Sequence, residues 1–165
     1  MKILVLSDSH SAIRFMRLCV DSLKPDAIIH LGDHFDDGEV IHEENPDILF
    51  YQVPGNCDRY RCPFGQPEIL IQTLFGVSLY ITHGHRHQVK QTMTFLLRDA
   101  RASKVQAVLY GHTHVADCHR EEDGQWVLNP GSCGYYGGSA GLIEIENNKI
   151  SSCRILRQED LEVMK

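Results

Sequence analysis

Several short segments of this 165-residue sequence carry Asp, Asn or His side chains of the kind that bind metal ions. They are Asp8-Ser9-His10, Gly32-Asp33, Gly55-Asn56, His83-Gly84-His85 and Gly111-His112-Thr113-His114. Histidine is the commonest metal ligand in proteins, and the sequence contains 10 histidines. Carboxylate, amide and imidazole donors together suit divalent ions such as Mn, Fe or Zn, whereas structural zinc sites are usually rich in cysteine. The segments therefore indicate a site for borderline to hard divalent metals.

Each segment taken alone also has a simpler interpretation. Asp8 and Ser9 are residues that favour a helix N-cap, and Gly32-Asp33 and Gly55-Asn56 are common turn dipeptides. The pair His112 and His114 fits metal ligation better than packing. Every one of the five segments directly follows a predicted strand. Their joint occurrence at such positions favours metal binding over the simpler interpretations.

The first half of the chain predicts alternating strands and helices. Apolar runs predict buried strands at 2–7, 27–31 and 48–53. Apolar residues at helical spacing predict a helix from Ala12 that ends before Pro25, and a short acidic helix is expected at 36–44. This order predicts parallel strands with right-handed crossovers, and ligands collect at the carboxyl ends of such strands.

The second half predicts mainly strands. We expect a loop at 54–67, a hairpin at 68–82 that turns near Gly76, a helix carrying Val89 to Ala100, and a buried strand at 105–110. The remainder predicts an antiparallel meander with strands at 115–120, 125–129, about 139–147 and 149–156. The pattern as a whole predicts an α/β protein with two mixed sheets packed face to face and helices outside, in a single domain over 1–165.

The motifs D-x-H, GD-x-x-D, GN-C-D, H-G-H and G-H-T-H occur in an order that resembles the calcineurin-like metallophosphoesterase superfamily. The sequence is most similar to the small bacterial and archaeal phosphodiesterases of that superfamily, with which it shares the later motif Asn129-Pro130-Gly131-Ser132. The similarity spans nearly the whole chain. It implies the four-layer α/β/β/α sandwich of the metallo-dependent phosphatases.

The resemblance also implies a binuclear metal centre. Asp8, His10 and His114 would bind one ion, Asn56, His83 and His112 would bind the other, and Asp33 would bridge the two. Manganese is the expected metal, with iron, zinc and nickel as alternatives. A hydroxide shared by the two ions would then attack phosphorus in line, and Asn56 would also hydrogen-bond the phosphoryl group.

The group that protonates the leaving group is left open by the sequence. Many larger members of the superfamily have a histidine after the GN dipeptide, supported by the last Asp of GD-x-x-D; here these positions are Cys57 and Asp36. A thiol cannot replace an imidazolium as an acid at neutral pH. His34, His85 and His87 are alternative donors, and His85 is preferred because it follows His83 by two residues.

Other residues near the motifs have simpler expected roles. Close relatives usually have a Pro-Arg pair a few residues after the Asn-Pro-Gly-Ser motif, whereas this chain has Cys-Gly-Tyr-Tyr-Gly-Gly at 133–138, so an arginine that would clamp phosphate is missing. Tyr135 and Tyr136 are either simply packed or stack on an aromatic or nucleoside leaving group. His30 is expected to be a hydrogen-bonded core residue, and Cys57 an ordinary buried thiol close to the site. His42 and His119 are expected at the surface. A solvated acidic helix face is predicted for Asp36, Asp37, Glu39, Glu43 and Glu44.

The composition narrows the class of partner. The formal net charge is -6, which argues against a nucleic-acid partner and hence against a nuclease. The six cysteines form no close CxxC pair, and the sequence shows neither a secretory signal nor a long apolar run, so we expect reduced thiols, a cytoplasmic location and no membrane contact. The resemblance is compatible with a homodimer.

Two function classes follow from these observations. The first is hydrolysis of a small phosphate ester, most simply a phosphodiester, by a metal-dependent phosphoesterase. The second is a protein-interaction scaffold with the same fold but no catalysis, as in a eukaryotic retromer subunit of this architecture. Missing metal ligands would favour the scaffold, but all the expected ligands are present in the sequence. Neither the substrate nor the native metal is specified by the sequence.

Overall fold

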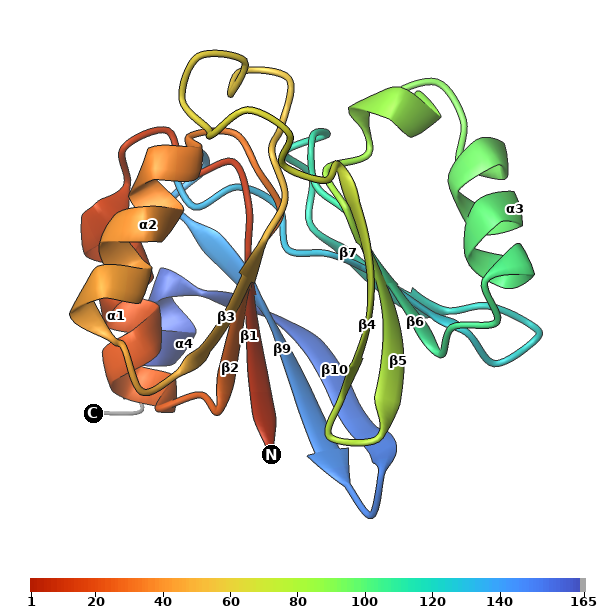
Figure 1. The fold of residues 1–165 in the computed structure, drawn as a ribbon. Helices are drawn as coiled ribbons and strands as arrows, with labels where there is room; N and C mark the ends of the chain where they lie inside the picture. Colours follow the sequence, from red (N-terminus) through yellow and green to blue (C-terminus); the bar gives the residue numbers. More distant parts are fainter. Residues whose placement is uncertain (164–165) are drawn as a thin grey trace.

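The computed structural model describes residues 1–163 and contains two five-stranded sheets that pack face to face (Figure 1). One sheet has the strand order β10-β9-β1-β2-β3, and the other has the order β4-β5-β6-β8-β7. The elements are β1 (Lys2–Leu6), α1 (Ile13–Leu23), β2 (Ala27–His30), α2 (Phe35–Glu44), β3 (Leu49–Gln52), β4 (Ile69–Leu74), β5 (Val77–Thr82), a 3-10 turn (His85–His87), α3 (Thr94–Ala102), β6 (Ala107–Leu109), β7 (Asp117–Arg120), β8 (Trp126–Asn129), β9 (Ser139–Glu146), β10 (Lys149–Arg157) and α4 (Gln158–Val163).

Three apolar layers hold the four structural layers together. In β1, Ile3 and Val5 face the other sheet, whereas Leu4 and Leu6 face the helices on the outside. A strand presents alternate residues to opposite faces. Because both faces of β1 are covered by apolar layers, all four side chains are fully buried. The third apolar layer lies between α3 and the second sheet and includes Leu96. Helices α1, α2 and α4 cover the first sheet and α3 covers the second, which confirms the predicted fold class (Figure 1).

The β-α-β-α-β prediction for the first half is confirmed. Strands β1, β2 and β3 pair in parallel, with Ile3 opposite Ala27 and Ala27 opposite Leu49. The predicted hairpin at 68–82 is formed by β4 and β5, and no helix or strand occurs in 54–67. Because the strands β1, β2, β3, β5 and β6 end on one side of the molecule, the loops that follow them meet there (Figure 1).

The four strands predicted for the C-terminal part are confirmed and form two antiparallel pairs, β7–β8 and β9–β10, but the prediction of one continuous meander is wrong. Strands β7 and β8 join the second sheet, where β8 pairs in parallel with β6, whereas β9 and β10 join the first sheet beside β1. The three residues Val127 to Asn129 of β8 are buried, so the sequence lacks the alternation that would have indicated a solvated meander strand.

Smaller differences occur at the ends of elements. Helix α3 begins at Thr94, although Val89 still packs in the same apolar layer. The turn at His85–His87 and helix α4 were not predicted. Within the described residues 1–163, no helix is long and apolar enough to cross a membrane.

Candidate metal centre

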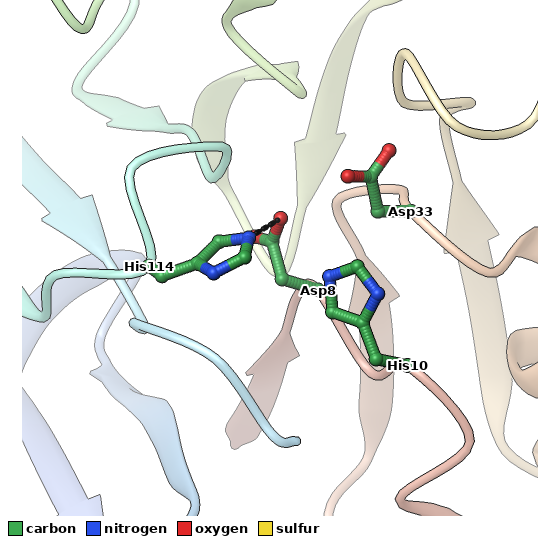
Figure 2. Close-up of side chains that lie close together, drawn as sticks. All are labelled: Asp8, His10, Asp33 and His114. Atoms are coloured by element: carbon green, nitrogen blue, oxygen red, sulfur yellow. Dashed lines mark ion pairs between the residues drawn. The ribbon is translucent and has the colours of Figure 1, made fainter. Parts of the chain in front are cut away.

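Four of the expected ligands converge at the common edge of the two sheets. Asp8 and His10 follow β1, Asp33 follows β2, and His114 follows β6. Each offers one donor atom, and these atoms all lie within 4.8 Å of one another (Figure 2). Residues separated by more than 100 positions therefore form one group.

The carboxylate of Asp8 has one satisfied oxygen and one free oxygen. Its Oδ2 accepts hydrogen bonds from Ser7 Oγ at 2.5 Å and from the backbone N–H of His112 at 3.0 Å. His114 Nε2 lies 3.1 Å from Oδ1, which is buried and accepts no other contact from a donor. His10 Nε2 is also buried without a partner. Because orphaned buried polar atoms are costly, this donor set fits a bound cation.

A second group of donors surrounds His83 after β5. His83 is fully buried, and its Nδ1 lies 2.8 Å from the carbonyl oxygen of Leu31. Since a carbonyl only accepts, Nδ1 must carry the proton, and the lone pair is on Nε2. Nε2 lies 3.2 Å from Asn56 Oδ1 and 3.6 Å from Asp33 Oδ1. With the neutral ring that metal binding requires, three electron-rich atoms converge here, and this arrangement suits a metal cation.

His112 completes the second group. Its ring centroid lies 5.0 Å from that of His83. Asp33 belongs to both groups, because it is close to Asp8, His10 and His114 on one side and to His83 on the other. The structure therefore brings all the predicted ligands together around Asp33.

The pKa shifts at His112, His10 and Asp8 favour the forms that bind metals, whereas the shift at His114 favours its protonated form. Burial lowers the pKa of His112 to about 4, and the neighbouring His83 contributes to that shift. Burial also lowers the pKa of His10. Burial would raise the pKa of Asp8, but His114 and other neighbours outweigh it, so the pKa is lowered. The proximity of Asp8 raises the pKa of His114. Neutral imidazoles and ionised carboxylates are the forms that bind metals.

Most of the ligands are held in an unusual backbone conformation. Positive φ angles occur at Asp8 (51°), His10 (44°), Asp33 (58°), His112 (68°) and His114 (60°). The left-handed region costs a non-glycine residue about 1–3 kcal/mol, and such residues cluster at functional sites. The surrounding contacts must therefore fix these loops.

Asp58, for which no role was predicted, supplies one such set of contacts. Its buried carboxylate accepts hydrogen bonds from the backbone N–H groups of Asp33 at 2.8 Å, Phe35 at 2.9 Å and Gly55 at 2.7 Å. It thereby joins the loop after β2 to the loop after β3. The last letter of the GN-C-D motif was the signal that pointed to it.

Asp37 corrects the prediction of a solvated acidic helix face. Its side chain is buried and accepts hydrogen bonds from Ser9 Oγ at 2.8 Å and from the backbone N–H of Ser11 at 2.7 Å. Asp37 therefore attaches α2 to the loop that carries His10. Within the same stretch, Asp36, Glu39, Glu43 and Glu44 are on the outside as expected.

The Asn-Pro-Gly-Ser motif supports the histidine loop after β6. Asn129 Nδ2 donates to the carbonyl oxygen of Gly111 at 3.1 Å and to Thr113 Oγ1 at 2.9 Å. Ser132 Oγ donates to the backbone carbonyl of Asp8 at 2.7 Å. The motif therefore fixes the loop that follows β6 and the backbone of Asp8.

Of the residues predicted for catalysis, Asn56 and His85 lie beside the metal ligands, whereas Asp36 lies on the surface. His85 is half-buried beside the ligands, with its ring centroid 5.4 Å from that of His83. Asp36 forms an ion pair with Arg61 at 2.8 Å on the surface. Asn56 and His85 both line a cavity of about 450 Å³, which extends along the loop 58–66.

Cys57 and Tyr135 also lie near the predicted ligands. Cys57 is exposed, so its prediction as a buried thiol is wrong, and its backbone N–H donates to Asp33 Oδ1 at 2.9 Å. Tyr135 stacks on His114 with centroids 5.0 Å apart and lies edge-on to His10 at 5.1 Å. Tyr136 is exposed.

The burial predicted for three further histidines is confirmed. His30 is fully buried and its ring nitrogens lie within hydrogen-bonding distance of Ser9 Oγ and the backbone N–H of Gly32. His42 and His119 are exposed. None of these three adds a donor to the groups around Asp33.

The four-layer fold and this set of donors define the class of metal-dependent phosphoesterases. The chain belongs to the calcineurin-like phosphoesterase superfamily, whose domain model matches residues 1–148. It is 27% identical over 166 residues to a phosphodiesterase of Methanocaldococcus jannaschii, covering 90% of this chain and 96% of that protein.

Solved structures show the same fold. A predicted phosphoesterase of Streptococcus pneumoniae superposes with a TM-score of 0.78 at 27% identity, covering 96% of this chain and 90% of that chain. Zinc-complexed Vps29 of Entamoeba histolytica gives a TM-score of 0.70 at 19% identity, covering 95% of this chain and 98% of that chain. The second likeness concerns the fold alone.

Proposed function

We propose that this protein hydrolyses small phosphodiesters with two divalent metal ions. Asp8, His10 and His114 bind one ion, and the second set of ligands is Asn56, His83 and His112. Asp33 bridges the two ions. The position of Asp33 between both donor groups is the single observation that carries this proposal.

The ions supply Lewis acidity, which makes water a nucleophile at neutral pH and neutralises charge on the phosphoryl oxygens. The chain supplies orientation. Ser7 and the backbone of His112 fix the carboxylate of Asp8, and Leu31 fixes the ring of His83, so the ligands need little rearrangement when a substrate arrives. Asn56 offers its amide oxygen to the metal, and the amide N–H group that does not donate to Cys57 Sγ is available to the phosphoryl group.

His85 is the residue that we propose contacts the leaving-group oxygen. It lies beside His83 and His112, and its Nδ1 is buried without a hydrogen-bond partner. Burial, together with the nearby His83, lowers the pKa of His85, so a neutral imidazole is present at pH 7. His85 therefore acts as a hydrogen-bond donor to the leaving group, and a good leaving group is preferred. Asp36 forms an ion pair with Arg61 and is given no direct role in the reaction.

A diester fits the site better than a monoester because the cavity beside Asn56 and His85 has room for a second ester group. This cavity of about 450 Å³ is lined by Arg59 and Phe64 among others. Within the described residues, Arg59 has no carboxylate partner, and its guanidinium lies over the ring of Tyr60. An exposed cation and aromatic groups are thus available to the non-reacting part of the ester.

The other expectations from the sequence are kept as part of this proposal. Manganese is the expected metal, with iron, zinc and nickel as alternatives, since oxygen and imidazole donors accept all four. The protein is expected in the cytoplasm, as a monomer or a homodimer.

The alternative is a scaffold without catalysis. The similarity in fold to zinc-complexed Vps29 means that metal binding alone does not separate the two functions. The scaffold is disfavoured because the ligands are complete and the cavity beside them is open.

Hydrolysis assays of metal-free protein reconstituted with Mn²⁺ test the proposal. We expect turnover of bis-p-nitrophenyl phosphate to exceed that of p-nitrophenyl phosphate. The substitutions Asp33→Asn and His112→Ala should each lower kcat/KM by at least about 100-fold, since removing a metal ligand removes the nucleophile. His119→Ala, at an exposed histidine outside the site, is the matched control. If no metal restores turnover, or if both variants match the parent, the scaffold is the better account.

A further inference from the structure

A second cavity lies at the edge of the molecule opposite the metal centre. It has a volume of about 710 Å³ and is lined by residues at the beginning of β6, β8 and β10, together with the end of α3. Strands β6 and β8 run from this cavity toward the metal centre, where β6 leads to His112 and β8 ends at Asn129. The cavity is therefore separate from the phosphoesterase site.

The lining of this cavity is basic, although the chain as a whole has a net charge of -6. Lys104, Arg120 and Lys149 line it, and within residues 1–163 none of them forms an ion pair with a carboxylate. The only carboxylate in the lining is Asp123, which is already paired with Arg101 at 2.8 Å. Three uncompensated cations at one cavity attract a multiply charged anion.

The wall of the cavity also offers a planar surface. Trp126 is partly buried, and the guanidinium carbon of Arg120 lies 5.7 Å from the centroid of its ring. An indole and a guanidinium plane both stack on flat aromatic groups. This combination distinguishes the cavity from a simple patch of surface lysines.

A buried amide in the lining lacks a partner. Gln125 is only 6% exposed; its Nε2 donates to the carbonyl oxygen of Val105 at 2.9 Å, whereas its Oε1 has no donor. A buried acceptor without a donor is unfavourable unless another group satisfies it.

We propose that this cavity binds a nucleotide with two or more phosphates. Lys104 and Lys149 contact the phosphates, and the base stacks on the guanidinium plane of Arg120, which lies over the ring of Trp126. The volume lies within the range of about 300–1,000 Å³ that is usual for small-molecule sites. This proposal does not depend on the function of the metal centre.

Intrinsic fluorescence gives a direct readout, because Trp126 is the single tryptophan of the chain. The full-length protein, kept metal-free with a chelator, is titrated with ADP. We expect saturable quenching and, by calorimetry, one site per chain. Arg120→Gln combined with Lys149→Gln should weaken binding at least about tenfold. The charge-matched control is Arg14→Gln combined with Lys24→Gln, which lie on α1 and at its end, away from the cavity.

The results of these titrations distinguish nucleotide binding at this cavity from binding at the metal centre and from general attraction of anions. Absence of saturable binding overturns the proposal, as does an equal loss of affinity in the charge-matched control. Tripolyphosphate binding as tightly as ADP overturns the role of the base. Binding that is retained by Asp33→Asn supports a site apart from the metal centre, and its loss in that variant overturns it. Thermal melts of each variant establish that the exposed substitutions leave the fold intact.

Discussion

At the scale of single residues, the ligands depend on a few buried acceptors that lie behind them. Asp58 accepts three backbone N–H bonds from two different loops, and no part of it is exposed. Such a carboxylate fixes the backbone on which Asp33 sits. A ligand held by its backbone in a left-handed conformation can keep that conformation only while these bonds persist.

The substitution Asp58→Asn tests this dependence. It keeps the size of the side chain but places an amide N–H₂ group against N–H donors, so at least one buried donor loses its acceptor. We expect the free energy of unfolding to fall by about 1–3 kcal/mol. Manganese affinity should fall by about 10–100-fold, as for other residues that orient metal ligands. Urea denaturation and calorimetric titration with Mn²⁺ measure the two effects.

Asp47→Asn is the control for that measurement. Asp47 is an exposed aspartate in the turn before β3, so its neutralisation should leave both stability and metal affinity within error of the parent. Equal behaviour of the two variants would contradict the role given to Asp58.

The residues that support the ligands were harder to predict than the ligands themselves. His112 and His114 are indicated by their spacing after a buried strand, a local pattern. Asp37 and Asp58 both accept hydrogen bonds from residues more than 20 positions away, and even the GN-C-D motif, which ends at Asp58, does not indicate those partners. Only the folded chain shows that each is buried and saturated with hydrogen bonds.

At the scale of elements, prediction succeeded where the connection between strands limits the topology. A helix between two strands forces a parallel crossover, and β1, β2 and β3 follow this rule. Short links between the later strands allow several pairings, and the actual one splits β7–β8 from β9–β10. The pairing of these strands depends on which apolar side chains become buried between the two sheets. A local sequence pattern does not specify such long-range contacts.

The loop after β6 lies close to the end of β1. A Cβ atom added at Gly111 would lie 2.0 Å from Ser7 Oγ and 2.9 Å from Asp8 Oδ2. Glycine is required here by proximity, since its φ is not positive. We expect Gly111→Ala to destabilise the protein by about 1–3 kcal/mol, because overpacking displaces the loop.

A double-mutant cycle with Ser7→Ala checks the cause. Removal of the hydroxyl group frees the space that the new methyl group needs, so the double variant should unfold at a higher denaturant concentration than additivity predicts. Strictly additive losses in urea denaturation would show that Gly111 does not approach Ser7 as described.

At the scale of the whole molecule, the edge that holds the metal ligands is built by both sheets. Asp8, His10, Asp33 and Asn56 come from loops of the first sheet, whereas His83, His112 and His114 come from loops of the second. A metal bound by both sets joins the two halves of the sandwich. Because the ions bind only the folded chain, they should also raise its apparent stability.

The most direct test of the binuclear site is the number of metal ions per chain. Protein loaded with Mn²⁺, freed of excess metal and analysed by inductively coupled plasma mass spectrometry should contain two ions per chain. His114→Ala, which removes a ligand from one group only, should retain one. A parent protein that holds a single ion or none after loading would contradict the account.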